Sequence, residues 1–250
     1  MFNIWIIEYS ATVTPFQLNA ISLNWSNETM ANTTSQSIGI ANSHSIKIWF
    51  KPSALIAGYL YVSRNYSTDI FNIIQIALQS SGKVFLDLYN SSWTRFKRYE
   101  TSTAYSIWTI SSIWYTWDWT TFKIYTNWTE DTSVNKIQDN SGVMTDSDRK
   151  VYIWSNVWVN SFLNWEVSKV DIWNNTLTSA ELLSLYDNWN GYKLDTRNTK
   201  WNYTSTVNLK HQWALGKNIG ANIWKDFVSS GNINISDNSV NITDADIVTF

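Results

Sequence analysis

The chain has 250 residues, a formal net charge of −2, two histidines and no cysteine. A chain without clustered lysine and arginine lacks the electrostatic footprint of a nucleic-acid-binding protein, and one without cysteine forms neither a disulfide framework nor a thiolate metal site. No run of about 18 apolar residues is present, so no membrane-spanning helix is predicted. We therefore expect no nucleic-acid partner and no membrane insertion.

The amino-terminal segment, residues 1–9, is apolar but lacks a basic region and a small-residue cleavage site. It is more typical of a first strand than of a signal peptide. Downstream, short runs alternate between apolar and polar residues, and a period of two indicates strands with one face in a core. The alternating runs are residues 45–50, 74–78, 84–88, 121–125 and 169–173.

Clusters of Asn, Ser, Asp and Gly separate these runs, for example at residues 80–82 and 139–142. Many strands without intervening helices indicate a sandwich. The sequence therefore predicts an all-β fold, an antiparallel two-sheet jelly-roll sandwich. It has no linker-like segment, so we expect a single domain over residues 1–250. Its core would span about residues 20–190, and an extension, residues 191–250, would cover the sandwich or add an edge strand.

One short helix is predicted near residues 178–189. Thr178 and Glu181 have the spacing of a capping box, in which each side chain bonds the backbone N–H of the other residue. Apolar residues then follow at helical spacing. Gly191, or a glycine in place of Trp189, would end the helix in the left-handed conformation.

The tryptophans have an unusual distribution. Four Asx-Trp pairs stand where hairpin turns are expected, although such turns need positive φ and favour glycine. The chain also has 17 tryptophans and only 8 glycines, whereas glycine normally makes up about 7% of residues. We hypothesise that a UGA codon meaning glycine in the source has been read as tryptophan, as some bacterial lineages and their viruses use it. The alternative is a genuinely tryptophan-rich sugar-binding protein.

Local pattern divides the tryptophans into three groups. Those that replace an expected glycine are Trp5, Trp25, Trp119, Trp128, Trp154, Trp158, Trp165, Trp189, Trp201 and Trp224. Those expected in the core are Trp49, Trp114, Trp117, Trp173 and Trp213. Trp93 and Trp108 fit neither group clearly.

Three segments together resemble the concanavalin A-like lectin/glucanase superfamily, in its laminin-G-like branch. Residues 45–52, SIKIWFKP, are similar to a strand of that family. Residues 114–128, WYTWDWTTFKIYTNW, resemble its hairpin, with tryptophan at both family glycines. Residues 164–186 resemble the family's last strand and capped helix. The resemblance covers roughly residues 20–190, and the tail is similar to tails on phage structural proteins of this family.

The resemblance raises two further expectations. Glucanases of the superfamily carry a Glu-x-Asp-x-x-Glu motif, which supplies paired carboxylates on one cleft; no Glu-x-Asp occurs here, and Asp87, Glu100, Glu166 and Asp171 are isolated in sequence. Relatives of this fold often bind calcium at a rim. Asp69, Asp87 and Asp171 are conceivable ligands, but no loop groups them, so we expect no metal and no cofactor.

A candidate glycan site lies on the strand–turn–strand at residues 83–99, because sugars bind to aromatic faces and short polar groups. Ordinary cross-strand aromatic pairs would give the same pattern. The two histidines, His44 and His211, are expected to be structural. The candidate ligand-binding residues are Tyr89, Asn90, Trp93, Arg95 and Tyr99.

The sequence thus predicts a non-catalytic glycan-recognition or adhesion module of a phage tail or cell-surface protein. Its partners would be a cell-surface glycan or neighbouring structural proteins, and its location the virion or the extracellular surface. One alternative is a structural virion or surface-assembly protein that binds no sugar. A glycoside hydrolase is the third alternative.

Overall fold

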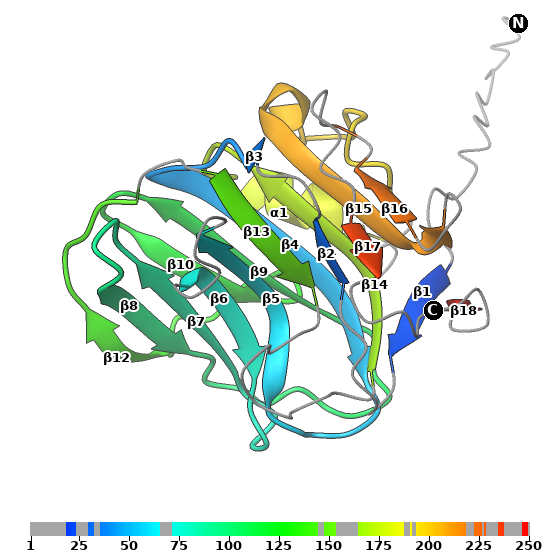
Figure 1. Ribbon diagram of the computed structural model, residues 1–250, viewed down its shortest axis with the longest axis horizontal. Coiled ribbons are helices and arrows are strands. Elements are labelled where there is room, and N and C mark those ends of the chain that lie inside the picture. Colours follow the sequence, from blue (N-terminus) through cyan, green and yellow to red (C-terminus); the bar gives the residue numbers. More distant parts are fainter. Residues whose placement is uncertain are drawn as a thin grey trace, which may run out of the picture.

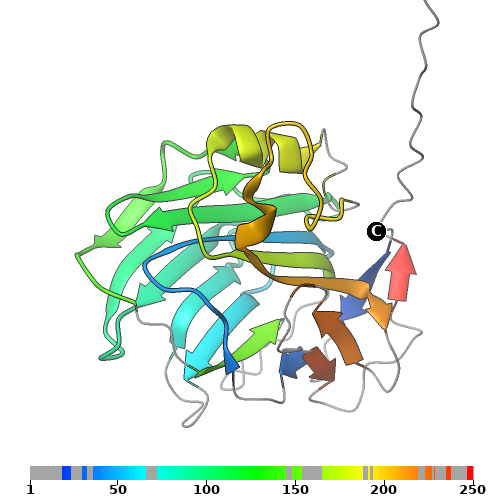
Figure 2. The same cartoon turned by 90° about the horizontal axis from the view of Figure 1, so that it is seen from above.

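The computed structural model confirms an antiparallel β-sandwich with one short helix (Figures 1 and 2). In Figure 2 the helix covers the outer face of one sheet, and the other sheet packs against the inner face of that sheet. No helix in the described part is long and apolar enough to cross a membrane. The structure describes residues 19–23, 30–32, 36–65, 72–144, 148–153, 165–187, 191, 194–218, 223–226, 228, 235–237 and 247–249.

The first sheet has a simple antiparallel order, beginning at the edge strand β12. The strands in spatial order are β12 (Asn135–Asp139), β8 (Arg95–Glu100), β7 (Val84–Tyr89), β6 (Asn72–Leu78), β5 (Gly58–Asn65) and β13 (Asp148–Ile153). Beyond β13 lie the short strands β2 (Met30–Asn32) and β3 (Gln36–Ser37).

The second sheet is built around β14 (Trp165–Trp173), which pairs with β4 on one side and with β15 and β1 on the other. From the opposite edge, the strands are β11 (Thr129–Glu130), β10 (Phe122–Thr126), β9 (Ser111–Asp118), β4 (Ser43–Pro52), β14, and then β15 (Leu209–Asn218) and β1 (Asn19–Leu23). β1 also pairs with β18 (Ile247–Thr249).

Two strands from the carboxy-terminal segment join the sheets along one edge. β16 (Ile223–Asp226) pairs with β15 of the second sheet, and β17 (Ile235–Asp237) pairs with β16 and with β2. The segment after residue 191 therefore contributes paired strands, and Trp213 and Leu215 of β15 are fully buried in the main core. A four-residue 3₁₀ helix, η2 (Ser205–Asn208), leads into β15.

The period-two pattern correctly predicts the faces of the central strands. Val84, Leu86 and Leu88 of β7 lie in the main core between the sheets, and burying each apolar side chain contributes about 1.5–3 kcal/mol. All five tryptophans expected in the core are at most 1% exposed. Trp117 and Trp213 lie between the sheets, whereas Trp49, Trp114 and Trp173 lie beneath the helix, on the outer face of the second sheet.

The helix α1 (Ser179–Tyr186) begins as predicted and ends earlier than predicted. The Thr178 hydroxyl accepts from the Glu181 N–H at 3.2 Å, and the Glu181 carboxylate accepts from the Thr178 N–H at 3.0 Å, which completes the capping box. The expected glycine cap is wrong. Asp187 has φ 50° and adopts the left-handed conformation itself, since aspartate tolerates it better than most residues.

The described tryptophans differ in backbone conformation, because four of them have positive φ. Of the non-glycine residues that the structure describes, six have positive φ: Trp93 (61°), Trp108 (60°), Trp119 (75°), Trp201 (48°), Asn127 (60°) and Asp187 (50°). For a bulky residue, this region of backbone space is a genuine outlier. No core tryptophan has it.

The ten tryptophans suspected of replacing glycine give a mixed result. Trp119 and Trp201 have positive φ, but Trp128 does not, and Trp165 and Trp224 lie in the strands β14 and β16. At residues 127–128, Asn127 carries the left-handed conformation. The remaining suspects lie outside the described residues: Trp5, Trp25, Trp154, Trp158 and Trp189. The expected strand at residues 1–9 lies outside them as well.

Candidate functional site

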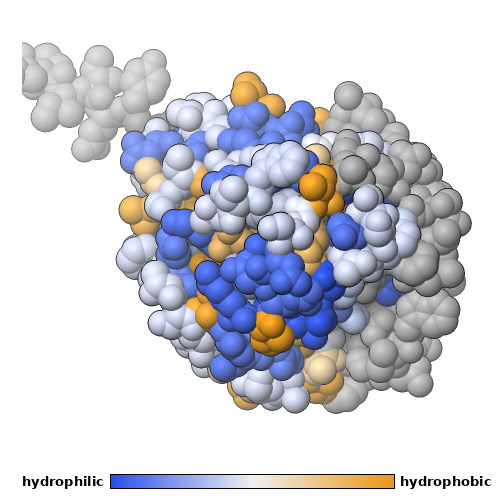
Figure 3. All heavy atoms as spheres, turned by 90° about the vertical axis from the view of Figure 1, so that its left-hand side faces the viewer, coloured by the Kyte–Doolittle hydropathy of each residue, from blue (hydrophilic) through white to orange (hydrophobic). Residues whose placement is uncertain are grey.

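The candidate site is the outer face of the first sheet, the face that points away from the sandwich core. Phe85, Asp87 and Tyr89 alternate with the buried leucines of β7 and therefore point to this face. Across the ladder, Asp87 is paired with Arg98, and Tyr89 with Arg95. The edge of the sandwich that carries β8 and β12 presents mainly hydrophilic side chains (Figure 3).

Asp87 anchors the basic residues of this face. Its side chain is fully buried although it points outward, and its carboxylate accepts from Arg98 through Nε at 2.7 Å and through Nη2. The Arg95 guanidinium lies 3.7 Å from the same carboxylate. The hydrogen bond from Arg98 to Asp87 raises the pKa of the guanidinium. One buried carboxylate thus fixes two arginine side chains.

Tyrosine hydroxyls continue this polar network across the sheet. The Tyr89 hydroxyl lies 3.3 Å from the Gln75 amide oxygen and 3.4 Å from the Asp87 carboxylate. Burial raises the pKa of Tyr89 to about 12 and also raises the pKa of Tyr59, which hydrogen-bonds the same glutamine. Both phenols are therefore protonated at neutral pH. The single O–H of Tyr89 is directed at Gln75 and Asp87, so toward a ligand its oxygen can accept a hydrogen bond from a hydroxyl group.

A shallow depression of about 390 Å³ lies at one end of this face. The Phe85 ring lines it, and the Arg98 guanidinium sits 4.7 Å from the ring centroid. Glu100, which accepts from Gln79 Nε2 at 2.6 Å, and the exposed Ile137 complete its wall. An aromatic floor with oriented polar groups at the rim is the usual composition of a small-molecule site.

The five site residues predicted from the sequence do not lie on one surface. Tyr89 and Arg95 lie together on the outer face of the first sheet, where Arg95 also donates to Gln138 at 2.9 Å. Asn90 shapes the β7–β8 turn, because its side-chain oxygen accepts from the Ser92 and Thr94 N–H groups at 3.0 and 2.9 Å.

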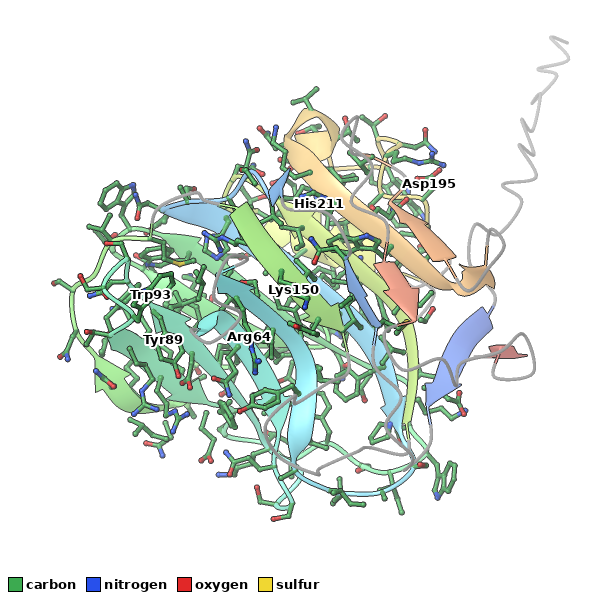
Figure 4. All side chains as sticks on the ribbon, in the orientation of Figure 1. Arg64, Tyr89, Trp93, Lys150, Asp195 and His211 are labelled. Carbon is green, nitrogen blue, oxygen red and sulfur yellow. The ribbon has the colours of Figure 1, made fainter. Side chains whose placement is uncertain are left out.

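The other two predicted residues lie on the core side. Trp93 packs against the main core at the β7–β8 turn, and Tyr99 is 2% exposed with its ring 4.8 Å from that of Phe122. Figure 4 shows Tyr89 and Arg64 over the first sheet, with Asp195 on the opposite side of the molecule.

Sequence reasoning missed Phe85, Asp87 and Arg98 as parts of this site. The signal was present, because the alternation that buries Leu86 and Leu88 places Phe85 and Asp87 on the same face as Tyr89. The pairing of Asp87 with Arg98 needed the hairpin register, which the sequence does not specify.

Each of the four carboxylates that are isolated in sequence is paired with a basic side chain, as shown above for Asp87 and Arg98. Glu166 accepts from Lys51 at 2.7 Å, and Glu100 lies 3.5 Å from Lys83. Asp171 is buried between Lys47 at 3.3 Å and Lys169 at 3.5 Å. A retaining glycosidase instead needs two carboxyl groups about 5 Å apart on one cleft.

The three residues named as conceivable calcium ligands do not form a calcium site where the structure describes them. The Asp87 and Asp171 carboxylates are occupied by arginines and lysines, and Asp69 lies outside the described residues. Among the described residues, no group of three or more His, Asp or Glu side chains could hold a metal ion.

Both histidines make structural hydrogen bonds. His44 is fully buried between the Ala41 carbonyl at 2.8 Å and the Tyr115 hydroxyl at 2.7 Å, and burial lowers its pKa to about 3. His211 bonds the Ile38 carbonyl at 2.9 Å and stacks on Trp213.

The amino-acid sequence shows no match in either comparison with known proteins. No protein-family model matches the chain, and no curated protein matches it in sequence.

Solved structures do match the fold. A heptameric pentraxin from Limulus polyphemus matches with a TM-score of 0.53 and 12% identity, over 78% of this chain and 90% of the pentraxin. A Bacteroides ovatus protein assigned as a carbohydrate binding protein matches with a TM-score of 0.56 and 14% identity. That match covers 94% of this chain and 60% of the other.

The receptor binding domain of botulinum neurotoxin D matches with a TM-score of 0.50 and 16% identity, over 68% of this chain and 44% of that one. At these identities the matches concern the fold. They confirm the antiparallel two-sheet jelly-roll sandwich that the sequence predicts.

Proposed function

We propose that the protein is a non-catalytic glycan-recognition module whose binding surface is the outer face of the first sheet. The observation that carries this proposal is the arrangement on β7 and β8, where two aromatic rings flank a fixed network of arginine, aspartate and tyrosine. Aromatic rings suit the C–H faces of sugars, and the oriented polar groups suit their hydroxyls.

The fold comparisons support the same class of function by analogy. The Bacteroides ovatus neighbour is assigned to carbohydrate binding, and this chain spans 60% of it. The neurotoxin neighbour is a receptor binding domain. A fold hosts many functions, so the argument for glycan binding depends on the surface itself. No metal or cofactor is part of the proposal.

The proposed biological context is a phage tail or a cell-surface protein, where an adhesion module meets glycans. The absence of a Glu-x-Asp motif and the pairing of each isolated carboxylate with a basic side chain support a non-catalytic role.

The test of glycan binding is an array of neutral and acidic glycans, probed with the full chain and with a Phe85→Ala/Tyr89→Ala variant. We expect retention of a defined subset of glycans and its loss in the variant. The matched control is Trp119→Ala, which removes an exposed ring from the β9–β10 turn, away from this face. If no glycan is retained, the protein is better explained as a structural assembly component.

We also propose that glycine is the natural residue at several tryptophan positions. Two suspects, Trp119 and Trp201, and both undecided residues, Trp93 and Trp108, have positive φ, which supports this idea, because glycine adopts that conformation without strain. The test is peptide mass spectrometry of protein from its native source across residues 93–119. Glycine at positions 93, 108 and 119 would support recoding, and tryptophan at all three positions would refute it.

A further inference from the structure

The outer face of the first sheet carries an excess of positive charge. Among its described side chains that are not fully buried, Lys83, Arg95, Arg98 and Lys150 are basic and Glu100 is acidic, while Asp87 and Arg64 are buried beneath them. The chain as a whole has a net charge of −2. This face is therefore opposite in sign to the protein that carries it, and such segregation favours an anionic partner.

The excess is concentrated at one point. Asp87 is the single carboxylate between the guanidiniums of Arg98 and Arg95, so one positive charge of the pair is not neutralised. The arginine side chains keep 27% and 32% of their surface exposed, whereas Asp87 keeps none. The charge that reaches solvent is therefore that of the arginines.

The two arginines are also held in place before any ligand arrives. Arg98 makes two hydrogen bonds to Asp87, and Arg95 donates to Gln138, whose amide returns a hydrogen bond to the Arg95 carbonyl at 2.6 Å. Less side-chain entropy is lost when pre-oriented groups bind a ligand. A guanidinium presents a planar fork that matches a carboxylate better than an ammonium does.

Aromatic rings border the arginine pair along β7. Phe85 and Tyr89 lie on either side of Asp87, and the four residue steps between them span roughly 13 Å of strand. The Phe85 ring opens into the 390 Å³ depression. This spacing gives the face room for an oligosaccharide with an acidic group between two ring contacts.

We propose that Arg95 and Arg98, fixed by Asp87, form the anion-binding centre of this face, and that its ligand is an acidic oligosaccharide that presents a sugar carboxylate. The inference rests on the proposed glycan-binding function and adds to it the chemical class of the ligand.

The test compares two probes with the same sugar rings, one with free carboxylates and one with those carboxylates esterified. The full chain is titrated calorimetrically with tri-galacturonic acid and with its methyl ester, which keeps the sugar rings and removes the carboxylates. We expect binding of the acid, weakening of at least about tenfold for the ester, and weaker binding at high salt, as charge-assisted hydrogen bonds require.

Variants locate the effect. Arg95→Gln is expected to weaken binding of the acid about tenfold or more and to weaken binding of the ester much less, because the ester has no carboxylate for the guanidinium to bind. Arg95→Lys keeps the positive charge but loses the planar fork of the guanidinium. Its affinity for the acid should lie between those of the parent and of Arg95→Gln. The matched control is Arg197→Gln, because Arg197 makes the same kind of paired contact with Asp195 in another part of the molecule.

The outcomes separate this inference from the proposed function. Equal binding of acid and ester, or an Arg95→Gln variant that binds like the parent, would overturn the acidic-ligand inference and leave glycan recognition intact. The same holds if neutral glycans alone are retained on the array. Equal binding of a DNA oligomer would show a general polyanion surface and would also overturn it. Failure to bind any glycan would remove both.

Discussion

Asp87 and Arg98 face each other across β7 and β8, and the aspartate carboxylate is fully buried while the arginine remains partly exposed. The buried member of this pair fixes the geometry and the exposed member presents the charge. Removing the carboxylate therefore has a different effect from removing either arginine.

The first prediction concerns Asp87→Ala. This change leaves Arg98 without its bidentate partner and should lower the free energy of unfolding by about 2 kcal/mol. Urea denaturation followed by tryptophan fluorescence measures the change. Asp195→Ala, which breaks the more exposed pair with Arg197, should cost less than about 1 kcal/mol. Equal losses in the two variants would contradict the anchoring role of Asp87.

The second prediction concerns tryptophans with positive φ. Trp119→Gly and Trp201→Gly should each raise the free energy of unfolding by about 1–3 kcal/mol, because glycine removes the strain of the left-handed conformation. Thermal melts provide the measurement. Trp128→Gly serves as the control, since Trp128 is similarly exposed but does not have positive φ. A gain in Trp128→Gly alone would refute the strain argument.

The third prediction concerns pH. Burial lowers the pKa of His44 from 6.5 to about 3, so between these values the unfolded chain binds a proton that the folded chain excludes. Stability therefore falls as pH drops through this window, by up to about 1.4 kcal/mol per pH unit. Denaturation at pH 6.5 and pH 4.5 should show a smaller difference in His44→Gln than in the parent. An identical difference would show that His44 is solvated.

The fourth prediction concerns the start of α1. Thr178→Ala removes the side chain that accepts from the Glu181 N–H and should cost about 1 kcal/mol. Glu181→Ala should cost more, because its carboxylate also accepts from the Ser205 N–H at 3.1 Å and so ties the helix to the segment before β15. Ser179→Ala, at an exposed position next to the cap, should be nearly neutral.

The fold could be predicted from sequence because its determinants are local. The period of two fixes the face of each strand, and the Thr178–Glu181 spacing fixes the start of the helix. The five core tryptophans were also recognisable, since each lies in an apolar or alternating strand run and each is buried.

The site was harder to predict because it depends on pairing between strands. Tyr99 pairs with Leu86 and shares its core-facing side, whereas a bulge between Arg95 and Lys97 leaves Arg95 opposite the outward-facing Tyr89. Trp93 turns inward at positive φ. Neither direction can be read from composition. The fixed arginines depend on Asp87, whose neighbours are known only once β7 and β8 are aligned.

The junction of β2 with β17 has a consequence for the order of folding. Ala31 pairs with Ser236, so these partners are separated by about 200 residues of chain. At a synthesis rate of about 5–20 residues per second, β17 is synthesised roughly 10–40 seconds after β2. During that interval one edge of β2 has no partner from β17, and an unpaired edge can join another chain. Slow translation or crowded nascent chains should therefore favour misassembly at this seam.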